Sequence, residues 1–141
     1  MPGPVIYIGT HIAHHAPHSG YDRIAAYVPS TLQAPNAVHR LLSRIPERVL
    51  AQIRRSAGTW YNSEALLQEI QAALHMMMQN SAIYHFLYGE DSFHYAGYWR
   101  VRRSNRLVAT FHMPPEKFRM IMRRTDHLKR LDAVVIVAPN Q

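Results

Sequence analysis

Short, nearly continuous apolar runs alternate along this chain with longer segments in which apolar residues recur every three or four positions. Runs of the first kind are typical of strands buried in a parallel sheet. They predict strands at residues 5–8, 82–88, 107–111 and 133–138, and a shorter strand is expected at residues 37–41. Strands that alternate with helices predict a parallel α/β sheet with helices on both faces.

The intervening segments have the spacing of amphipathic helices. The clearest helix is predicted over residues 63–78, where Asn62 can cap the first turn and Glu64 suits its positive end. Its inward-facing positions are predicted to be Leu66, Leu67, Ile70, Ala73, Leu74, Met77 and Met78. Further helices are expected at residues 21–27, 46–57, 93–103 and 115–124. We therefore expect residues 1–141 to form a single Rossmann-like domain with a mainly parallel sheet of about five strands.

Composition narrows the class of protein. The 141 residues are 48% hydrophobic and 18% charged, which is typical of a globular domain rather than a disordered chain. There is no cysteine, so disulfides, thiolate nucleophiles and cysteine-based zinc sites are excluded. The N-terminus lacks the basic region of a signal peptide, and no apolar run approaches the roughly 20 residues of a membrane span. We expect a cytoplasmic protein.

Positive charge is concentrated in one late segment. The chain has a net charge of +7, yet residues 100–130 alone hold ten basic and two acidic residues, a net charge of +8. This asymmetry favours a basic patch that contacts an anionic partner, such as a membrane surface at which the protein would be peripheral. The alternative is a set of solvated helix faces. The segment has no nucleic-acid recognition motif, so no nucleic acid partner is expected.

Three loops are expected to meet at the carboxyl edge of the sheet, where open α/β sheets bind ligands. The first loop, residues 10–20, carries four histidines whose spacing would place them on one side of a helix: His11, His14, His15 and His18. Such a cluster could hold a metal ion, but Pro17 interrupts the helix that it needs. Metal binding is therefore the alternative that we do not favour.

The interpretation that we favour for this loop is contact with a substrate. Ser19-Gly20 allows a ligand to approach the backbone at the N-terminus of the next helix. His15, His18 and Tyr21 then supply polar groups beside it. The loop lacks the full G-x-G-x-x-G dinucleotide pattern, so a dinucleotide cofactor is not indicated.

The other two loops carry ionisable side chains. Glu90 and Asp91 follow the predicted strand 82–88, where they can hydrogen-bond a substrate hydroxyl or only cap the following helix. His112 follows the strand 107–111, and the Pro114-Pro115 pair holds its turn rigid, which suits a polar contact or an acid–base group. The alternative is a histidine that merely satisfies a loop carbonyl. No Ser/His/Asp order, P-loop or H-E-x-x-H motif is present in the sequence.

A family resemblance follows from two late stretches and the first loop. Residues 107–115 read LVATFHMPP, residues 127–138 read HLKRLDAVVIVA, and residues 19–23 read SGYDR. Together they resemble the N-terminal half of the group-1 (family 4) retaining glycosyltransferases. This resemblance implies a GT-B architecture, in which an N-terminal Rossmann-like domain binds the acceptor and a C-terminal one binds the nucleotide-sugar donor.

The resemblance also implies roles for single residues. His112 would be the catalytic histidine, beside the transferred sugar, and Ser19-Gly20 would lie near the donor diphosphate. The family usually has two adjacent glycines in that loop, and Ser19 stands in place of the first. The Lys/Arg pair and the Glu-x7-Glu element with which the family holds the donor belong to a second domain that is not within these residues.

We therefore expect the acceptor-side half of a sugar-nucleotide-dependent glycosyltransferase, whose partners are the C-terminal donor-binding domain and a sugar or glycolipid acceptor. No cofactor is expected beyond the nucleotide-sugar co-substrate. Without the donor domain there is no closed cleft to stabilise a leaving diphosphate, so these residues alone are not expected to transfer sugar. The alternative is a stand-alone basic module that binds anionic lipid or polysaccharide through Arg100 to Arg130.

Overall fold

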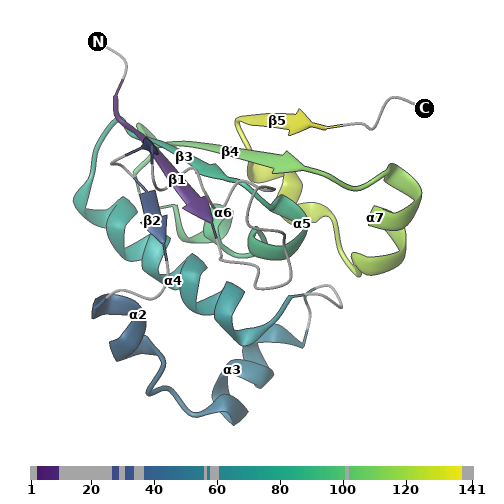
Figure 1. The fold of residues 1–141 in the computed structure, drawn as a ribbon, viewed down its shortest axis with the longest axis horizontal. Helices are drawn as coiled ribbons and strands as arrows, with labels where there is room; N and C mark the ends of the chain where they lie inside the picture. The colour runs from purple at the N-terminus through teal and green to yellow at the C-terminus, as the bar shows by residue number, and fades with distance from the viewer. Residues whose placement is uncertain are drawn as a thin grey trace.

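The computed structural model describes residues 3–9, 27–28, 31–33, 37–55, 57, 61–100 and 102–137. They form an α/β domain built on one five-stranded parallel sheet with the strand order β2-β1-β3-β4-β5 (Figure 1). The strands are β1 (Val5–Gly9), β2 (Thr31–Gln33), β3 (Ile83–Phe86), β4 (Arg106–Phe111) and β5 (Ala133–Ile136). The prediction of a single, parallel, Rossmann-like sheet is confirmed.

Helices lie between or beside the strands along the chain. They are α2 (Ala37–Leu42), α3 (Glu47–Arg54), α4 (Ser63–Met78), α5 (Gly89–Ser92), α6 (Ala96–Trp99) and α7 (Pro115–Ile121), with the 3₁₀ helix η2 (Asp126–Arg130) before β5. None of the helices among the described residues is both long and apolar enough to cross a membrane. The helix predicted at residues 21–27 falls almost wholly outside the described residues.

The prediction of a strand at residues 37–41 was wrong. This segment is helix α2, and the edge strand β2 lies earlier, at Thr31–Gln33. Val38, Leu41 and Leu42 are separated by three and four positions, which is the spacing of one helix face rather than of a strand. A three-residue strand leaves too little sequence for alternation to be recognised.

One face of the sheet is packed against α4. Ile8, Phe86 and Leu107 lie on this face of three neighbouring strands and are fully buried, with Ala72 and Met76 of α4 in the same apolar cluster. A second cluster joins α4 to α3 through Leu50 and Leu66. Figure 1 shows α3 next to α4, on the side of α4 away from the sheet. Since α4 contributes to both clusters, it is the central helix of the domain.

The α4 prediction was correct in its bounds and only partly correct in its buried face. Asn62 caps the helix by accepting a hydrogen bond from the Ala65 N–H at 2.8 Å. The buried positions continue through Ala72 and Met76, whereas Leu74, Met77 and Met78 are exposed. The prediction counted only apolar positions as buried. In the structure the buried face of α4 also includes the polar residues Gln68, Glu69 and Gln71.

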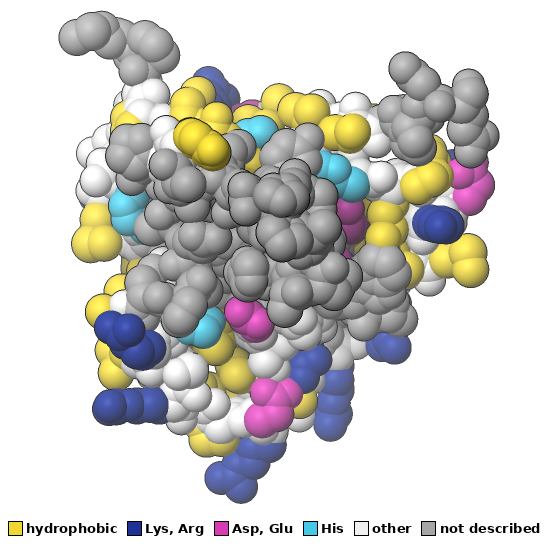
Figure 2. All heavy atoms as spheres, viewed as in Figure 1, with side chains coloured by type: hydrophobic (Ala, Val, Ile, Leu, Met, Phe, Trp, Pro, Cys, Tyr) yellow, Lys and Arg dark blue, Asp and Glu magenta, His cyan; other side chains and the backbone are white. Residues whose placement is uncertain are grey.

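The last strand differs from the prediction of a buried one. All four residues of β5 are exposed, although they pair in parallel register with β4. Figure 2 shows hydrophobic side chains gathered along the upper edge of the molecule, over β5. Continuous apolar sequence identified the strand correctly, but burial depends on what lies beside it in the folded domain.

Candidate functional site at the carboxyl edge of the sheet

The strand order creates a natural ligand site. From β1 the chain passes to β2 on one side of the sheet and then to β3 on the other, so the connections leave β1 and β3 in opposite directions. In open parallel sheets, ligands bind outside the carboxyl ends of the strands at such a switch point. Gly9 ends β1 at this edge, and the segments after β3 and β4 bring Glu90, Asp91 and His112 to the same edge.

The structure brings these three predicted residues together. The backbone N–H of His112 donates to Glu90 Oε1 at 3.2 Å, joining the end of β4 to α5. The His112 Nε2–H donates to the Leu87 carbonyl oxygen at 2.8 Å, since a carbonyl can only accept. The ring of Tyr88 lies 5.0 Å from the His112 ring, centroid to centroid. The orientation and tautomer of His112 are thus fixed by the end of β3.

The two carboxyl groups have shifted proton affinities. Burial raises the pKa of Glu90, while hydrogen bonds from backbone N–H groups, including that of His112, oppose the shift. Burial raises the pKa of Asp91 to about 6, the Glu90 carboxylate adds to the rise, and His112 opposes it. Glu90 Oε2 is buried and has no partner among the described residues. Carboxyl groups with raised pKa values beside a fixed imidazole can exchange protons with hydroxyl groups near neutral pH.

A close approach of the backbone shapes this edge. At the start of α5, a Cβ on Gly89 would lie 2.6 Å from the ring of Phe111, so the residue after Tyr88 must lack a side chain for β3 and β4 to sit this close. Beside it, Gln68 of α4 donates from Nε2 to the Gly9 carbonyl oxygen at 2.5 Å. The end of β1 is therefore held by α4.

The first loop cannot be placed against this site. His15, His18, Ser19, Gly20 and Tyr21 all lie outside the described residues, as do the remaining histidines of the loop. Within the described part of the chain, no group of three or more His, Asp or Glu side chains is positioned to hold a metal ion.

Much of the predicted basic patch is engaged within the molecule. Arg100 and Arg106 both pair with Asp132, whose carboxylate also accepts the Leu107 N–H, so these charges fix β4 to the start of β5. Arg102 donates to the Met77 carbonyl oxygen and to Asn80. Other basic side chains of the segment remain exposed, among them Lys117, Arg119 and Lys129.

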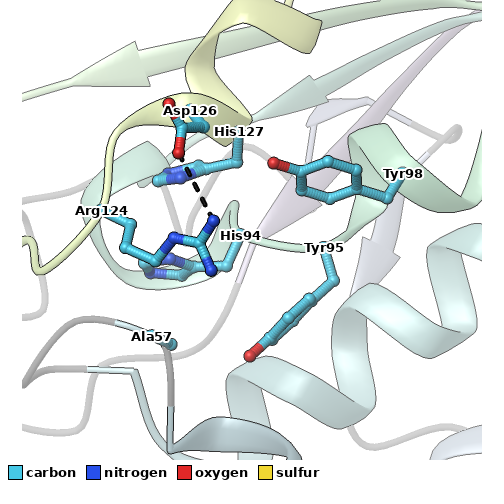
Figure 3. A pocket seen from close by; sticks show the side chains of 7 residues that line it. All are labelled: Ala57, His94, Tyr95, Tyr98, Arg124, Asp126 and His127. Carbon is cyan, nitrogen blue, oxygen red and sulfur yellow. Dashed lines mark hydrogen bonds and ion pairs between the residues drawn. The ribbon is translucent and has the colours of Figure 1, made fainter.

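A second cluster was not predicted from the sequence. His94 and His127 lie with ring centroids 4.8 Å apart beside a cavity of about 300 Å³ (Figure 3). Both side chains are buried, and neither Nε2 atom has a partner among the described residues. Nothing in the sequence pattern distinguishes these two histidines, because they are far apart in the chain and meet only when η2 packs against α6.

One buried carboxylate holds the backbone of this cluster in place. Glu69 of α4 is fully buried, accepts the N–H groups of His94, Tyr95 and Ala96, and is hydrogen-bonded by the Tyr61 hydroxyl. These bonds lie at the start of α6, and of the helix predicted over residues 93–103 only this short segment, Ala96–Trp99, is helical among the described residues. The sequence holds one indication of this network, which is Glu69 itself, a charged residue beside the apolar face of the helix predicted at residues 63–78.

The fold and the edge cluster define a Rossmann-like α/β domain with a candidate ligand site at its topological switch point. No protein-family model, curated protein or solved structure matches the chain.

Proposed function

We propose that this chain is the acceptor-side domain of a retaining glycosyltransferase that uses a nucleotide-sugar donor. The observation that carries the proposal is the convergence of Glu90, Asp91 and His112 at the carboxyl edge. The family resemblance assigned His112 to the active site from sequence alone, and this histidine occupies the edge at which open α/β sheets bind ligands.

In this proposal the residues of the edge bind and orient rather than supply a nucleophile. Glu90 and Asp91 accept hydrogen bonds from acceptor hydroxyl groups, for which Glu90 Oε2 has an unused lone pair. His112 presents a ring of fixed orientation beside the transferred sugar, because Leu87 holds its Nε2–H. A donor-binding domain supplies the contacts to the diphosphate, and the family resemblance assigns Ser19-Gly20 to the same group.

The test uses the purified chain and has two parts. Incubated with nucleotide sugars and oligosaccharide acceptors, the chain should release no nucleoside diphosphate, because in this proposal a separate donor-binding domain supplies the contacts to the diphosphate. Titrated with the same ligands, it should show backbone resonance changes centred on Gly89–Asp91 and His112. Glu90→Gln should weaken these changes by several-fold, whereas the matched substitution His75→Gln, on α4 away from the edge, should not. Efficient sugar transfer by the chain alone would contradict the proposal, as would ligand effects that bypass the edge.

A second candidate function is contact with an anionic membrane surface. On α7, Met120 is 82% exposed, directly after the exposed cation Arg119 and one helical turn after the exposed cation Lys117. Beside this helix lies an apolar groove of about 210 Å³, lined in part by Phe118 and Ile136. Basic side chains that flank exposed apolar ones are suited to anionic lipid. Figure 2 shows this mixture of basic and hydrophobic side chains over α7.

Vesicle co-sedimentation tests this second candidate. Binding should require anionic lipid, fall as salt is raised, and weaken in the double variant Lys117→Gln/Arg119→Gln. The control Arg40→Gln/Arg44→Gln removes the same charge from the segment around α2. Equal losses in the two variants would indicate attraction by net charge alone and would exclude α7 as the contact surface.

A further inference from the structure

Strand β5 forms one edge of the sheet, and it lacks the features by which proteins usually protect such an edge. It is the outermost strand, and among the described residues no strand pairs with its outer side, the side away from β4 (Figure 1). Residues 133–137 have no charged side chain and no proline, and Val134 to Val137 are 39–68% exposed. Natural edge strands are usually very short, charged or covered. The opposite edge follows this rule, because β2 has only three residues.

The backbone of β5 presents hydrogen-bonding groups to this outer side. The Val137 N–H donates to the Phe111 carbonyl oxygen of β4 at 2.9 Å. Backbone groups point alternately to the two sides of an extended strand, so Val135 also faces β4, whereas the N–H and C=O groups of Val134 and Ile136 face outward. The parallel register with β4 runs through every residue of β5 without a bulge. Two donors and two acceptors therefore point to the side on which no described strand lies.

An apolar groove lies along one face of β5. Val134 and Ile136 line this groove, whose volume is about 210 Å³, with Phe111, Phe118 and three further residues, all of them apolar. In a strand paired to the outer side of β5, every second side chain would lie on the face of this groove. Strand addition obtains affinity from main-chain hydrogen bonds and specificity from pockets for alternate side chains. The groove therefore favours a partner strand with Val, Ile or Leu at alternate positions.

Exposed basic side chains stand near both ends of β5. They are Lys129 and Arg130 of η2, directly before the strand, and Lys117 and Arg119 of α7, the helix that borders the groove. The acidic residues nearest to them in the chain are Glu116, Asp126 and Asp132, of which the last two already pair with arginines. A partner with carboxylates on both sides of its apolar residues is therefore complementary in charge to this surface.

The same observations disfavour two other occupants. A lipid tail cannot pair with the backbone groups of Val134 and Ile136, because acyl chains have neither donors nor acceptors. A second copy of the chain would bring like charges together. In a two-fold antiparallel pair, the start of one β5 lies beside the end of the other, which sets the η2 cations of each copy toward the α7 cations of the other. Each copy also has a net charge of +7.

We propose that the outer side of β5 binds an extended segment of a partner protein as a sixth strand of the sheet. This segment has apolar side chains at alternate positions and acidic residues on both sides of them. Its backbone pairs with Val134 and Ile136, its apolar side chains lie along the groove, and its carboxylates lie near Lys129 and Lys117. The interaction goes beyond the glycosyl transfer proposed above, because it uses no residue of the carboxyl edge.

The test follows amide hydrogen exchange by NMR while the chain is titrated with a synthetic peptide in which Val and Ile alternate with Thr between pairs of Glu. A dissociation constant of roughly 100 μM is expected. At about ten times that concentration of peptide, exchange of the Val134 and Ile136 amides should slow about tenfold, because they exchange only from the unbound chain. The Val135 and Val137 amides face β4 and should change less. This alternation distinguishes a paired strand from a ligand that contacts side chains alone.

Variants of the strand test the backbone pairing. Val134→Pro removes an outward N–H without removing a bond to β4, so it should weaken peptide binding by roughly tenfold or more. If this variant fails to fold, Ile136→Lys provides the same comparison, since a lysine on an edge strand opposes pairing. A peptide with Pro at its centre should not bind to the unmodified chain.

A second pair of variants tests the charges. Lys117→Gln/Lys129→Gln should weaken binding by about threefold, because each exposed ion pair contributes little. The control Arg40→Gln/Arg44→Gln has the same net charge and should bind normally. A peptide with Lys in place of Glu should bind more weakly than the acidic peptide.

Four results would overturn the proposal. In the chain alone, Val134 and Ile136 amides that exchange as slowly as that of Val137 would mean that another part of the chain covers this side of β5. Protection that rises with protein concentration, together with a dimer in sedimentation, would assign the surface to a second copy. Protection by anionic vesicles and not by the peptide would assign it to lipid, and equal binding of the acidic and basic peptides would exclude the charge complementarity. None of these results alters the response of Glu90 and His112 to sugar ligands, so the function proposed for the carboxyl edge is tested separately.

Discussion

Two buried glutamates in this domain have opposite surroundings. Glu69, on α4, accepts hydrogen bonds from three backbone N–H groups and from the Tyr61 hydroxyl. Glu90, on α5, accepts the N–H of His112 with one oxygen, and its other oxygen is buried without a partner among the described residues. A buried polar group with all its bonds made holds structure together, whereas one left incomplete at a strand end is available to a ligand.

The same contrast applies to the histidines. His75 and His85 bond to Tyr84 and Thr110 and complete the packing of α4 and the sheet. His94 and His127 leave Nε2 unpartnered within the described residues, at the wall of a cavity. Since an unsatisfied buried polar atom costs about 1–3 kcal/mol, such atoms are rare unless something else compensates for them.

The largest expected effect is on stability. Glu69→Ala should lower the free energy of unfolding by roughly 3–5 kcal/mol, because it leaves several buried donors without an acceptor. Glu90→Ala, the matched change, should lower it by only about 1 kcal/mol, since one hydrogen-bonded oxygen is lost. Urea unfolding followed by circular dichroism measures both. Equal losses in the two variants would remove the distinction between a structural and an available carboxylate.

The free energy of unfolding should depend on pH in opposite directions for the buried glutamate and for the two buried histidines. Burial raises the pKa of Glu69 to about 7, against hydrogen bonds that lower it. Its contribution to stability is therefore complete below pH 4.5 and is lost as the pH rises toward 7. His94 and His127 have lowered pKa values, so their contribution is complete above pH 6.5 and is lost as the pH falls toward 4 and 3.

Unfolding free energies measured from pH 4 to 8 test these signs. Glu69→Gln should remove the loss between pH 4.5 and 7, whereas His127→Phe should reduce the loss on the acid side. A variant that shifts the whole curve without changing its slope would show that the replaced group does not titrate differently in the folded and unfolded chain.

The sequence predicted the sheet well and the site in part. Continuous apolar runs identified β1, β3, β4 and β5, and the carboxyl ends of β3 and β4 in a parallel sheet already placed Glu90 and His112 at one edge. The sequence did not show which of the two buried glutamates would have all its hydrogen bonds made. Glu69 and Glu90 differ in the donors that reach them from distant segments, and those donors are set by tertiary packing rather than by local pattern.

The smallest expected effect concerns the available carboxylate itself. In Glu90→Gln the negative charge next to Asp91 is removed, so the pKa of Asp91 should fall from about 6 toward its ordinary value, by less than one unit, because burial is the larger cause of the rise. The side-chain carboxyl resonance of Asp91, followed by NMR from pH 3 to 8, measures this shift. The same titration in Glu69→Gln should leave Asp91 unchanged. A shift of equal size in both variants would mean that Asp91 responds to a general change in the domain, and the edge could no longer be treated as a coupled pair of carboxyl groups.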